Sequence, residues 1–178
     1  VAILGFTGFV WQGLLNFYEL YNLKKVLGQA TAKNLLTVVF AAGIPAFLLS
    51  GRLADRLPHV PYLISIVAAF VTSLFVLTRV DGLVPVVAVT AVLGYVIHSL
   101  FPALDTYLLD TLPDEHRASA YAVYSGGMMV IQAMGSVAVG TLAETGLTYD
   151  SIFVGFAAGL GVLVVTLVGL QQTGRLPT

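Results

Sequence analysis

Long apolar stretches, separated by short polar connections, are the feature that most constrains how this chain can fold. Several of them approach the roughly 20 residues that an α-helix needs to cross a bilayer. Charged residues make up only 10% of the 178 residues, whereas soluble domains carry about a quarter. The sequence therefore predicts an integral membrane protein. The expected spans are residues 1–21, 35–50, 61–78, 83–109, 120–143 and 151–170.

The spans are expected to be helices that pack into one bundle. In hydrocarbon, every backbone N–H and C=O group must be bonded within its own segment or within a closed barrel. Barrel strands are about ten residues long and alternate in polarity, and these spans are longer and continuously apolar. Every connection is short, and none resembles a soluble domain. The predicted fold is an all-α integral membrane protein, with residues 1–178 as a single domain of six transmembrane helices.

Composition argues against several functional classes. The net charge of -1 provides no field that attracts nucleic acid. The chain has no cysteine, which excludes a disulfide framework, a thiolate metal site and a thiol nucleophile. No segment resembles a phosphate-binding loop, a hydrolase nucleophile turn or a zinc-binding His-Glu-x-x-His helix. We therefore expect no enzyme activity, no metal and no cofactor.

The start of the chain resembles a transmembrane segment of the mature protein and not a signal peptide. It reads VAILGFTGFVWQGLL and lacks the basic n-region of a signal peptide. It also lacks an initiator Met, which suggests that the chain is a piece of a longer protein.

Basic residues do not orient the chain in the membrane. Six spans put both termini on one side, and the eight Lys and Arg residues divide equally between the two sides. The positive-inside rule therefore gives no preference. The side of the termini holds Arg52, Arg56, Arg117 and Arg175. The opposite side holds Lys24, Lys25, Lys33 and Arg79.

The short turn between the second and third spans concentrates charge. Within LLSGRLADRLPHVPYLIS, Leu48 to Ser65, the hexamer GRLADR runs from Gly51 to Arg56. It resembles the G-x-L-a-D-R signature between the second and third helices of each half of major facilitator superfamily transporters. Two spans later, LPDEHRASAYAVYSGG resembles the acidic-then-Arg entry to the fifth helix of a half. With the helix count and loop order, the resemblance covers essentially the whole chain.

Two departures from the family's pattern favour the carboxy-terminal half. The signature continues as Leu57-Pro58-His59-Val60 where the family often has Gly-Arg-Lys, and the fourth span contains no arginine. The resemblance implies a transporter of twelve helices in two six-helix halves. The partners would then be the lipid bilayer, a small-molecule substrate and a second six-helix half, on the same polypeptide or as another copy. It also implies a multi-pass protein of the cell membrane with both termini cytoplasmic.

The charged turn also has a chemical interpretation. Gly51 can end a helix in close packing, in the manner of a C-cap, and Asp55 can stabilise the N-terminus of a neighbouring helix. Acidic residues on the same side, such as Asp110, are available to Arg52 and Arg56. The resemblance implies a conformational latch that holds the interface between the halves closed; alternatively, the charges only keep a short loop in water. The candidate latch residues are Gly51, Arg52, Asp55, Arg56, Asp110 and Arg117.

Polar groups inside the spans are rare because they are costly there, so by default they mark a pathway or a buried partner. In the first span, Gln12, Asn16 and Glu19 follow helical spacing and share one face. In the fourth span, His98 and Asp105 are separated by two helical turns and also share a face.

The resemblance implies that the first and fourth helices line a central cavity, which would put both stripes at a substrate site. Two alternatives remain open: Glu19 can lie solvated among headgroups, and His98 can be hydrogen-bonded to the backbone of a neighbouring helix. His98 can change charge near neutral pH, which leaves proton coupling open. The candidate cavity, substrate or proton residues are Gln12, Asn16, Glu19, His98, Asp105 and Gln132.

Glycines on the last two spans predict close helix contacts, because small residues let helix backbones approach in a membrane. These glycines are Gly126, Gly127, Gly135, Gly140, Gly155 and Gly159.

The leading hypothesis is one half of a secondary active transporter that moves a small solute by alternating access. The alternative is a non-transporting six-helix subunit or receptor that binds a ligand or lipid.

Overall fold

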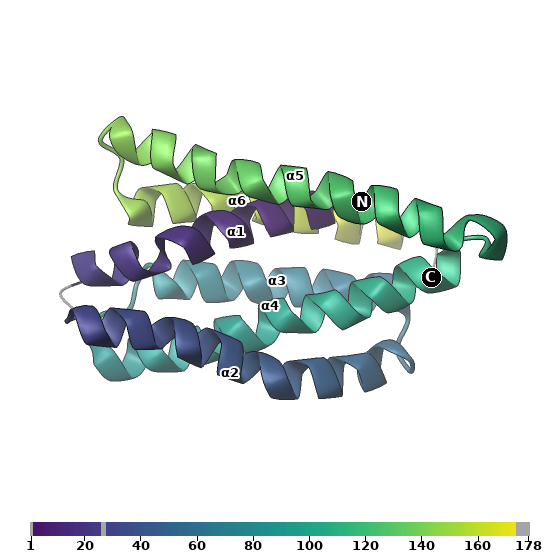
Figure 1. Ribbon diagram of the computed structural model, residues 1–178, viewed down its shortest axis with the longest axis horizontal. Coiled ribbons are helices and arrows are strands. Elements are labelled where there is room, and N and C mark those ends of the chain that lie inside the picture. Colours follow the sequence, from purple (N-terminus) through teal and green to yellow (C-terminus); the bar gives the residue numbers. More distant parts are fainter. Residues whose placement is uncertain (1, 26–27, 174–178) are drawn as a thin grey trace.

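The computed structural model describes residues 2–25 and 28–173 as a bundle of long helices (Figure 1). Val1, where the first span was predicted to begin, and Arg175 lie outside the described residues. No strand occurs in these ranges, so the predicted all-α bundle is confirmed. The helices are α1 (Ala2–Lys24), α2 (Gln29–Ala54), α3 (His59–Leu77), α4 (Leu83–Thr111), α5 (Arg117–Glu144) and α6 (Tyr149–Gln172), with a 3-10 turn η1 (Asp114–His116) before α5.

Five of these helices, α2 to α6, are long and apolar enough to cross a membrane. The exception is α1, in which Gln12, Asn16 and Glu19 lower the hydropathy. At 23 residues, α1 is about 35 Å long, enough to cross the roughly 30 Å hydrocarbon core. Its apolar face is fully buried at Val10 and Leu14. We therefore treat α1 as the sixth spanning helix. On its polar face, Asn16 is exposed, and Gln12 and Glu19 are half-buried.

The bundle consists of two groups of three helices. Figure 1 shows α1, α5 and α6 on one side and α2, α3 and α4 on the other. The most extensive contacts are between α2 and α4 and between α1 and α5, while α3 connects the groups by touching both α4 and α6. Contacts between α4 and α5 are few. Figure 1 shows α4 diverging from α2 toward its carboxyl end, which brings that end close to the start of α5.

The two closest helix pairs depend on glycines. A Cβ at Gly94 would lie 2.5 Å from the carbonyl oxygen of Val39, so α4 reaches α2 only without a side chain there. A Cβ at Gly135 would overlap the carbonyl of Phe9 on α1, and the predicted close contact at Gly135 is confirmed. Small residues allow this approach in membranes, where apolar attraction between helices is weak.

The other glycine predictions are weaker or wrong. A Cβ at Gly140 or Gly159 would meet only an aromatic ring edge, at 3.3–3.4 Å. A Cβ at Gly126, Gly127 or Gly155 would meet no described atom within 4 Å. These three glycines lie on exposed faces of their helices, which spacing along the helix could not indicate.

The helices extend beyond the predicted spans where polar residues continue the helical backbone. The second span was predicted at 35–50, but α2 occupies Gln29–Ala54. The additional residues include Gln, Ala, Lys, Arg and Leu, which are good helix formers. As a result, the first four residues of the charged turn belong to the last turn of α2.

Candidate functional site

A pocket of about 240 Å³ lies between α1, α4 and α5, and we call it the α1–α4–α5 pocket. Trp11 comes from α1, Asp105 from the carboxyl half of α4, and the remaining polar groups from the amino half and the middle of α5. The pocket therefore occupies the region where α4 and α5 make few direct contacts. Its polar lining residues are Asp105, Tyr121, Tyr124, Ser125 and Gln132.

Asp105 is the one carboxylate of the pocket, and it is half-buried. The Tyr121 hydroxyl donates a hydrogen bond to Asp105 Oδ1 at 2.8 Å. The neighbouring Tyr124 hydroxyl is buried and has no hydrogen-bond partner among the described residues. No Lys or Arg of the described ranges forms an ion pair with Asp105. The pocket thus combines a carboxylate that lacks a cation with a hydroxyl that lacks a partner.

The apolar walls of the pocket are aromatic, thioether and aliphatic side chains. Trp11 is only 6% exposed. The other apolar lining residues are Ile97, Leu100, Phe101, Leu104, Met128 and Met129. Thioethers are polarizable and adapt to irregular ligand shapes. Such a lining fits a small molecule with an apolar body.

The predicted stripe of α1 is bound to α5 and lies outside the pocket lining. Gln12 Nε2 donates to Asn16 Oδ1 at 3.4 Å, and Asn16 Nδ2 donates to Ser136 Oγ. The Ser136 hydroxyl lies 3.4 Å from the Gln12 carbonyl oxygen. Glu19 is half-buried and forms no ion pair or side-chain hydrogen bond with a described residue. The stripe therefore joins α1 to α5, while Gln132, one turn earlier on α5, reaches the pocket beside Gly8.

His98 and Asp105 do not share the pocket, although their spacing predicts one face. His98 is 7% exposed and packs against Gly43 of α2, where a Cβ would lie 2.8 Å from its ring. The rings of Trp11 and Phe40 contact it edge-on. The space left by Gly43 accepts the imidazole, which the spacing within α4 could not reveal.

The hydrogen bond of His98 differs from the alternative that the sequence left open. Its Nδ1 lies 2.7 Å from the Gly94 carbonyl oxygen, so the acceptor belongs to its own helix and not to a neighbouring one. Because a carbonyl only accepts, this contact requires a hydrogen on Nδ1.

The charged side chains of the charged turn, residues 51–56, are exposed and unpaired among the described residues. The side chains of Arg52, Asp55 and Arg56 are exposed, and none forms an ion pair with a described residue. Gly51 is not a C-cap: α2 continues to Ala54, and Asp55 occupies the capping position, where its backbone N–H bonds the Gly51 carbonyl. No close packing requires Gly51 either, since a Cβ there would meet nothing within 4 Å.

The acidic partners expected for the two arginines bind other residues. Asp110 Oδ2 lies 3.2 Å from Nε2 of His59 at the start of α3. Arg117 lies 2.5 Å from Asp114, three residues earlier, across the η1 turn. Asp55 does not cap α3 or α5, as neither start has a side-chain cap. In the conformation described, neither Arg52 nor Arg56 therefore forms an ion pair with Asp110, the acidic residue that the sequence makes available to them.

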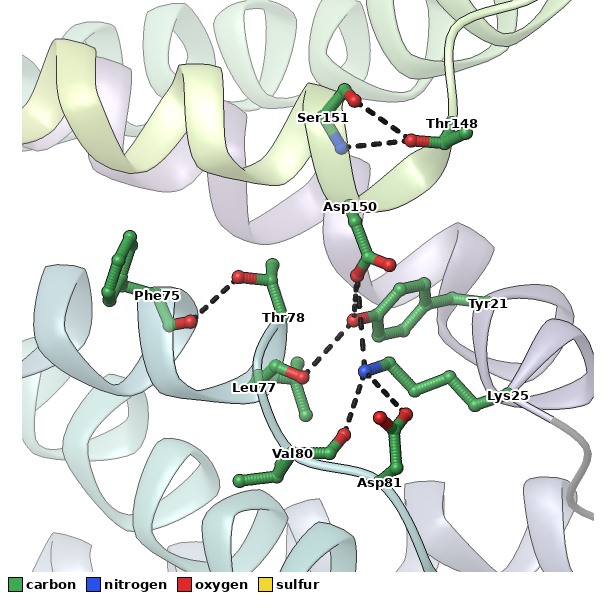
Figure 2. A network of polar contacts seen from close by, with 10 residues as sticks. All are labelled: Tyr21, Lys25, Phe75, Leu77, Thr78, Val80, Asp81, Thr148, Asp150 and Ser151. Carbon is green, nitrogen blue, oxygen red and sulfur yellow. Dashed lines mark hydrogen bonds and ion pairs between the residues drawn. The ribbon is translucent and has the colours of Figure 1, made fainter.

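A different charged group, which we call the Lys25 cluster, lies at the opposite end of the bundle (Figure 2). It consists of Tyr21, Lys25, Asp81 and Asp150. The side chain of Lys25 is only 7% exposed. Its Nζ lies 3.5 Å from Asp81 Oδ1 and 3.9 Å from Asp150 Oδ1. The same Nζ donates a hydrogen bond to the Val80 carbonyl oxygen at 2.8 Å.

Tyr21 completes the cluster from one turn earlier on α1. Its hydroxyl donates to Asp150 Oδ1 at 2.6 Å and lies 3.2 Å from the Leu77 carbonyl oxygen. Figure 2 shows Tyr21 of α1 and Lys25, which directly follows α1, meeting Asp150 of α6 and the α3–α4 connection. Asp150 is placed there by the start of α6, where Thr148 accepts a hydrogen bond from the Ser151 N–H at 3.2 Å. The cluster joins three segments that are distant in sequence.

The sequence analysis did not identify the Lys25 cluster, because it considered Lys25 only as one of the basic residues that could orient the chain in the membrane. One signal was available: the connections after α1, α3 and α5 reach the same end of an up-and-down bundle. Each of those connections carries charge near it, at Lys25, Asp81 and Asp150.

Comparison with known proteins gives one family match. Residues 1–175 match the family model described as Major Facilitator Superfamily. No curated protein matches the chain. No solved structure matches it either.

Proposed function

The chain belongs to the major facilitator superfamily of membrane transporters, and from that premise we propose that it is one six-helix half of a secondary transporter working by alternating access. It is a multi-pass membrane protein, and members of this family transport small-molecule substrates across the bilayer. The proposal adds three elements: the α1–α4–α5 pocket as part of the substrate path, a second half that covers it, and the charged turn as a latch.

The pocket is the observation that carries the proposal. A carboxylate and four further polar side chains from α4 and α5 converge on it inside a predominantly apolar bundle. Ionisable groups at membrane depth are costly and face a bundle interior or a water-filled path. Transporters of this kind bind substrate near the midplane, between helices. This convergence supports a substrate path better than a purely structural role.

The need for a second half follows from the exposure of the Asp105 carboxylate. Asp105 is half-buried within this chain alone, so one side of the carboxylate would meet lipid. Lipid offers it neither a cation nor a hydrogen bond. We propose that a second six-helix half, on the same polypeptide or as another copy, closes the pocket.

The charged turn is proposed to contact that second half in one of two conformations. Arg52, Asp55 and Arg56 are unpaired within the described residues, so partners from outside this half are compatible with their geometry. A latch of this kind acts only if its contacts differ in strength between the two states.

Alternating access can be tested by labelling, because the chain contains no cysteine. Ser125→Cys places a thiol in the pocket with little change in volume. A membrane-impermeant maleimide should label it from both faces, in right-side-out and in inverted vesicles. Glu144→Cys, exposed at the carboxyl end of α5, is the matched control and should be labelled from one face only.

The outcome separates the two functional classes. Labelling of Ser125→Cys from a single face would favour a subunit or receptor that binds a ligand without moving it. Asp105→Asn then probes the site: a proton site loses pH-driven uptake but keeps substrate exchange, whereas a substrate contact loses both. We expect loss of both with normal folded yield, and reduced folded yield would instead assign Asp105 a structural role.

A further inference from the structure

We propose that the α1–α4–α5 pocket binds an organic cation, namely a protonated amine attached to a compact apolar or aromatic body. The inference rests on the proposed transport function and adds the substrate class. It follows from the charge, the aromatic walls and one unpartnered hydroxyl of the pocket.

The charge of the pocket is negative and uncompensated. Asp105 accepts a hydrogen bond from Tyr121 at 2.8 Å, but no Lys, Arg or His lines the pocket among the described residues. The nearest basic side chain along α5, Arg117, pairs with Asp114. An isolated carboxylate in a low-dielectric site is disfavoured unless it takes up a proton or a cation joins it. A cationic ligand supplies that missing partner.

The walls favour an organic cation over a metal ion. Trp11, Phe101 and Tyr124 line the same pocket as the carboxylate, and aromatic faces attract ammonium groups. A hard metal cation would need several oxygen ligands. No group of three His, Cys, Asp or Glu side chains able to hold a metal occurs in the described ranges.

The buried Tyr124 hydroxyl selects among ammonium groups. It has no hydrogen-bond partner among the described residues, and an unpaired buried hydroxyl is costly. A protonated primary amine can donate one N–H to Tyr124 and another to Asp105. A quaternary ammonium has no N–H to donate. The volume of about 240 Å³ lies just below the range of roughly 300–1,000 Å³ for small-molecule pockets, so the ligand is compact.

Trp11 makes the test direct, because it is the chain's single tryptophan and lines the pocket. The chain in lipid nanodiscs is titrated at pH 7 with three probes of matched shape: phenethylamine, which is cationic, 2-phenylethanol, which is neutral, and 3-phenylpropionate, which is anionic. We expect a saturable change in Trp11 fluorescence with phenethylamine. The other two should bind at least about tenfold more weakly, as expected for loss of a charged contact.

Variants assign the binding to the proposed groups. Asp105→Asn should weaken phenethylamine binding at least about tenfold, and Asp105→Glu should retain most of it. Tyr124→Phe should weaken it by about threefold to tenfold, the effect of one hydrogen bond. Glu144→Gln, an exposed carboxylate far along α5, should leave binding unchanged. If Asp105→Asn does not fold, Asp105→Glu and Tyr124→Phe still provide the measurement.

Three results would overturn the inference: equal binding of the amine and the alcohol, preference for the carboxylate, or no saturable response. A Trp11 signal that follows pH through Asp105 without any amine binding would also overturn it, in favour of a proton site. Two-sided labelling of Ser125→Cys without amine binding rejects the ligand class and keeps the transport function. Amine binding with one-sided labelling rejects transport and keeps the ligand class.

Discussion

At one end of the bundle, Lys25 lies covered between two carboxylates, and at the other end Arg52 and Arg56 are exposed without an ion-pair partner among the described residues. Both ends carry similar charges on short connections. At the Lys25 end the charges come from the residue directly after α1, from α6 and from the α3–α4 connection, and they pair with one another (Figure 2). At the other end, the charged turn contacts none of the acidic residues expected for it.

The difference separates two uses of charge in one bundle. Charges that are paired within the described chain stabilise it, since removing one member leaves the others unsatisfied. Charges that are unpaired within it contribute little to its stability and are available for contacts with another molecule or segment. We therefore expect variants at the Lys25 end to change folding and variants at the charged turn to change function.

The largest expected effect is that of Lys25→Met. This change keeps the apolar stem but removes the charge, the bond to Val80 and both ion pairs. We expect a loss of about 2–3 kcal/mol in the free energy of unfolding, because a covered charged hydrogen bond is lost. Thermal unfolding in detergent, followed by Trp11 fluorescence, measures it. Arg56→Met is the matched control, and its effect should stay within about 0.5 kcal/mol. Equal losses of unfolding free energy in Lys25→Met and Arg56→Met would contradict the proposed difference between the two ends of the bundle.

Asp55→Asn should give the opposite result. It removes the one negative charge of the turn and keeps the size of the side chain, and no described contact of that side chain is lost. If the turn acts as a latch, the ratio of Ser125→Cys labelling from the two faces should shift by about tenfold, or roughly 1.4 kcal/mol. The melting temperature should not change. An unaltered labelling ratio would leave the turn as a solvated loop.

Tyr21→Phe sharpens the comparison within the Lys25 cluster. It removes the hydroxyl that binds Asp150 at 2.6 Å and retains the buried ring. We expect a loss of about 1 kcal/mol in unfolding free energy, typical of one hydrogen bond. In the Lys25→Met background the loss should be smaller, since the two changes share Asp150. Full additivity in the double variant would argue against a single connected cluster.

The smallest effect is expected for Asp114→Asn at the other end. The ion pair with Arg117 is local, three residues apart, and Asp114 is 87% exposed. Exposed pairs of this kind contribute about 0.3–0.5 kcal/mol and are screened by salt. Unfolding measured at low and at high salt should therefore differ between wild type and variant only at low salt. A loss comparable to that of Lys25→Met would make this pair part of a buried network.

The number and order of the helices could be predicted from the sequence, but their ends could not. Apolar length is a local property, and it indicated each span. Hydropathy does not register that Gln29 to Asn34 and Gly51 to Ala54 continue α2, because those residues are polar or small yet compatible with a helix.

The candidate site was predictable only in part. Asp105 and Gln132 were indicated by their polarity within apolar spans, and both line the pocket. The Tyr121 bond to Asp105 and the placement of His98 against Gly43 depend on which helices are neighbours. Spacing within one helix carries no information about the neighbouring helix.

The sequence by itself determined that this is an all-α membrane protein with the signature of a transporter family, because both properties reside in contiguous residues. Only the tertiary structure decided which charges are satisfied. Lys25, Asp81 and Asp150 are far apart along the chain, and they meet because three connections converge at one end of the bundle. Arg52 and Asp110 have a similar separation in sequence and do not meet, because Asp110 faces His59 instead. Electrostatic energy depends on distances of a few ångströms, and those distances are set by helix packing and not by position in the sequence.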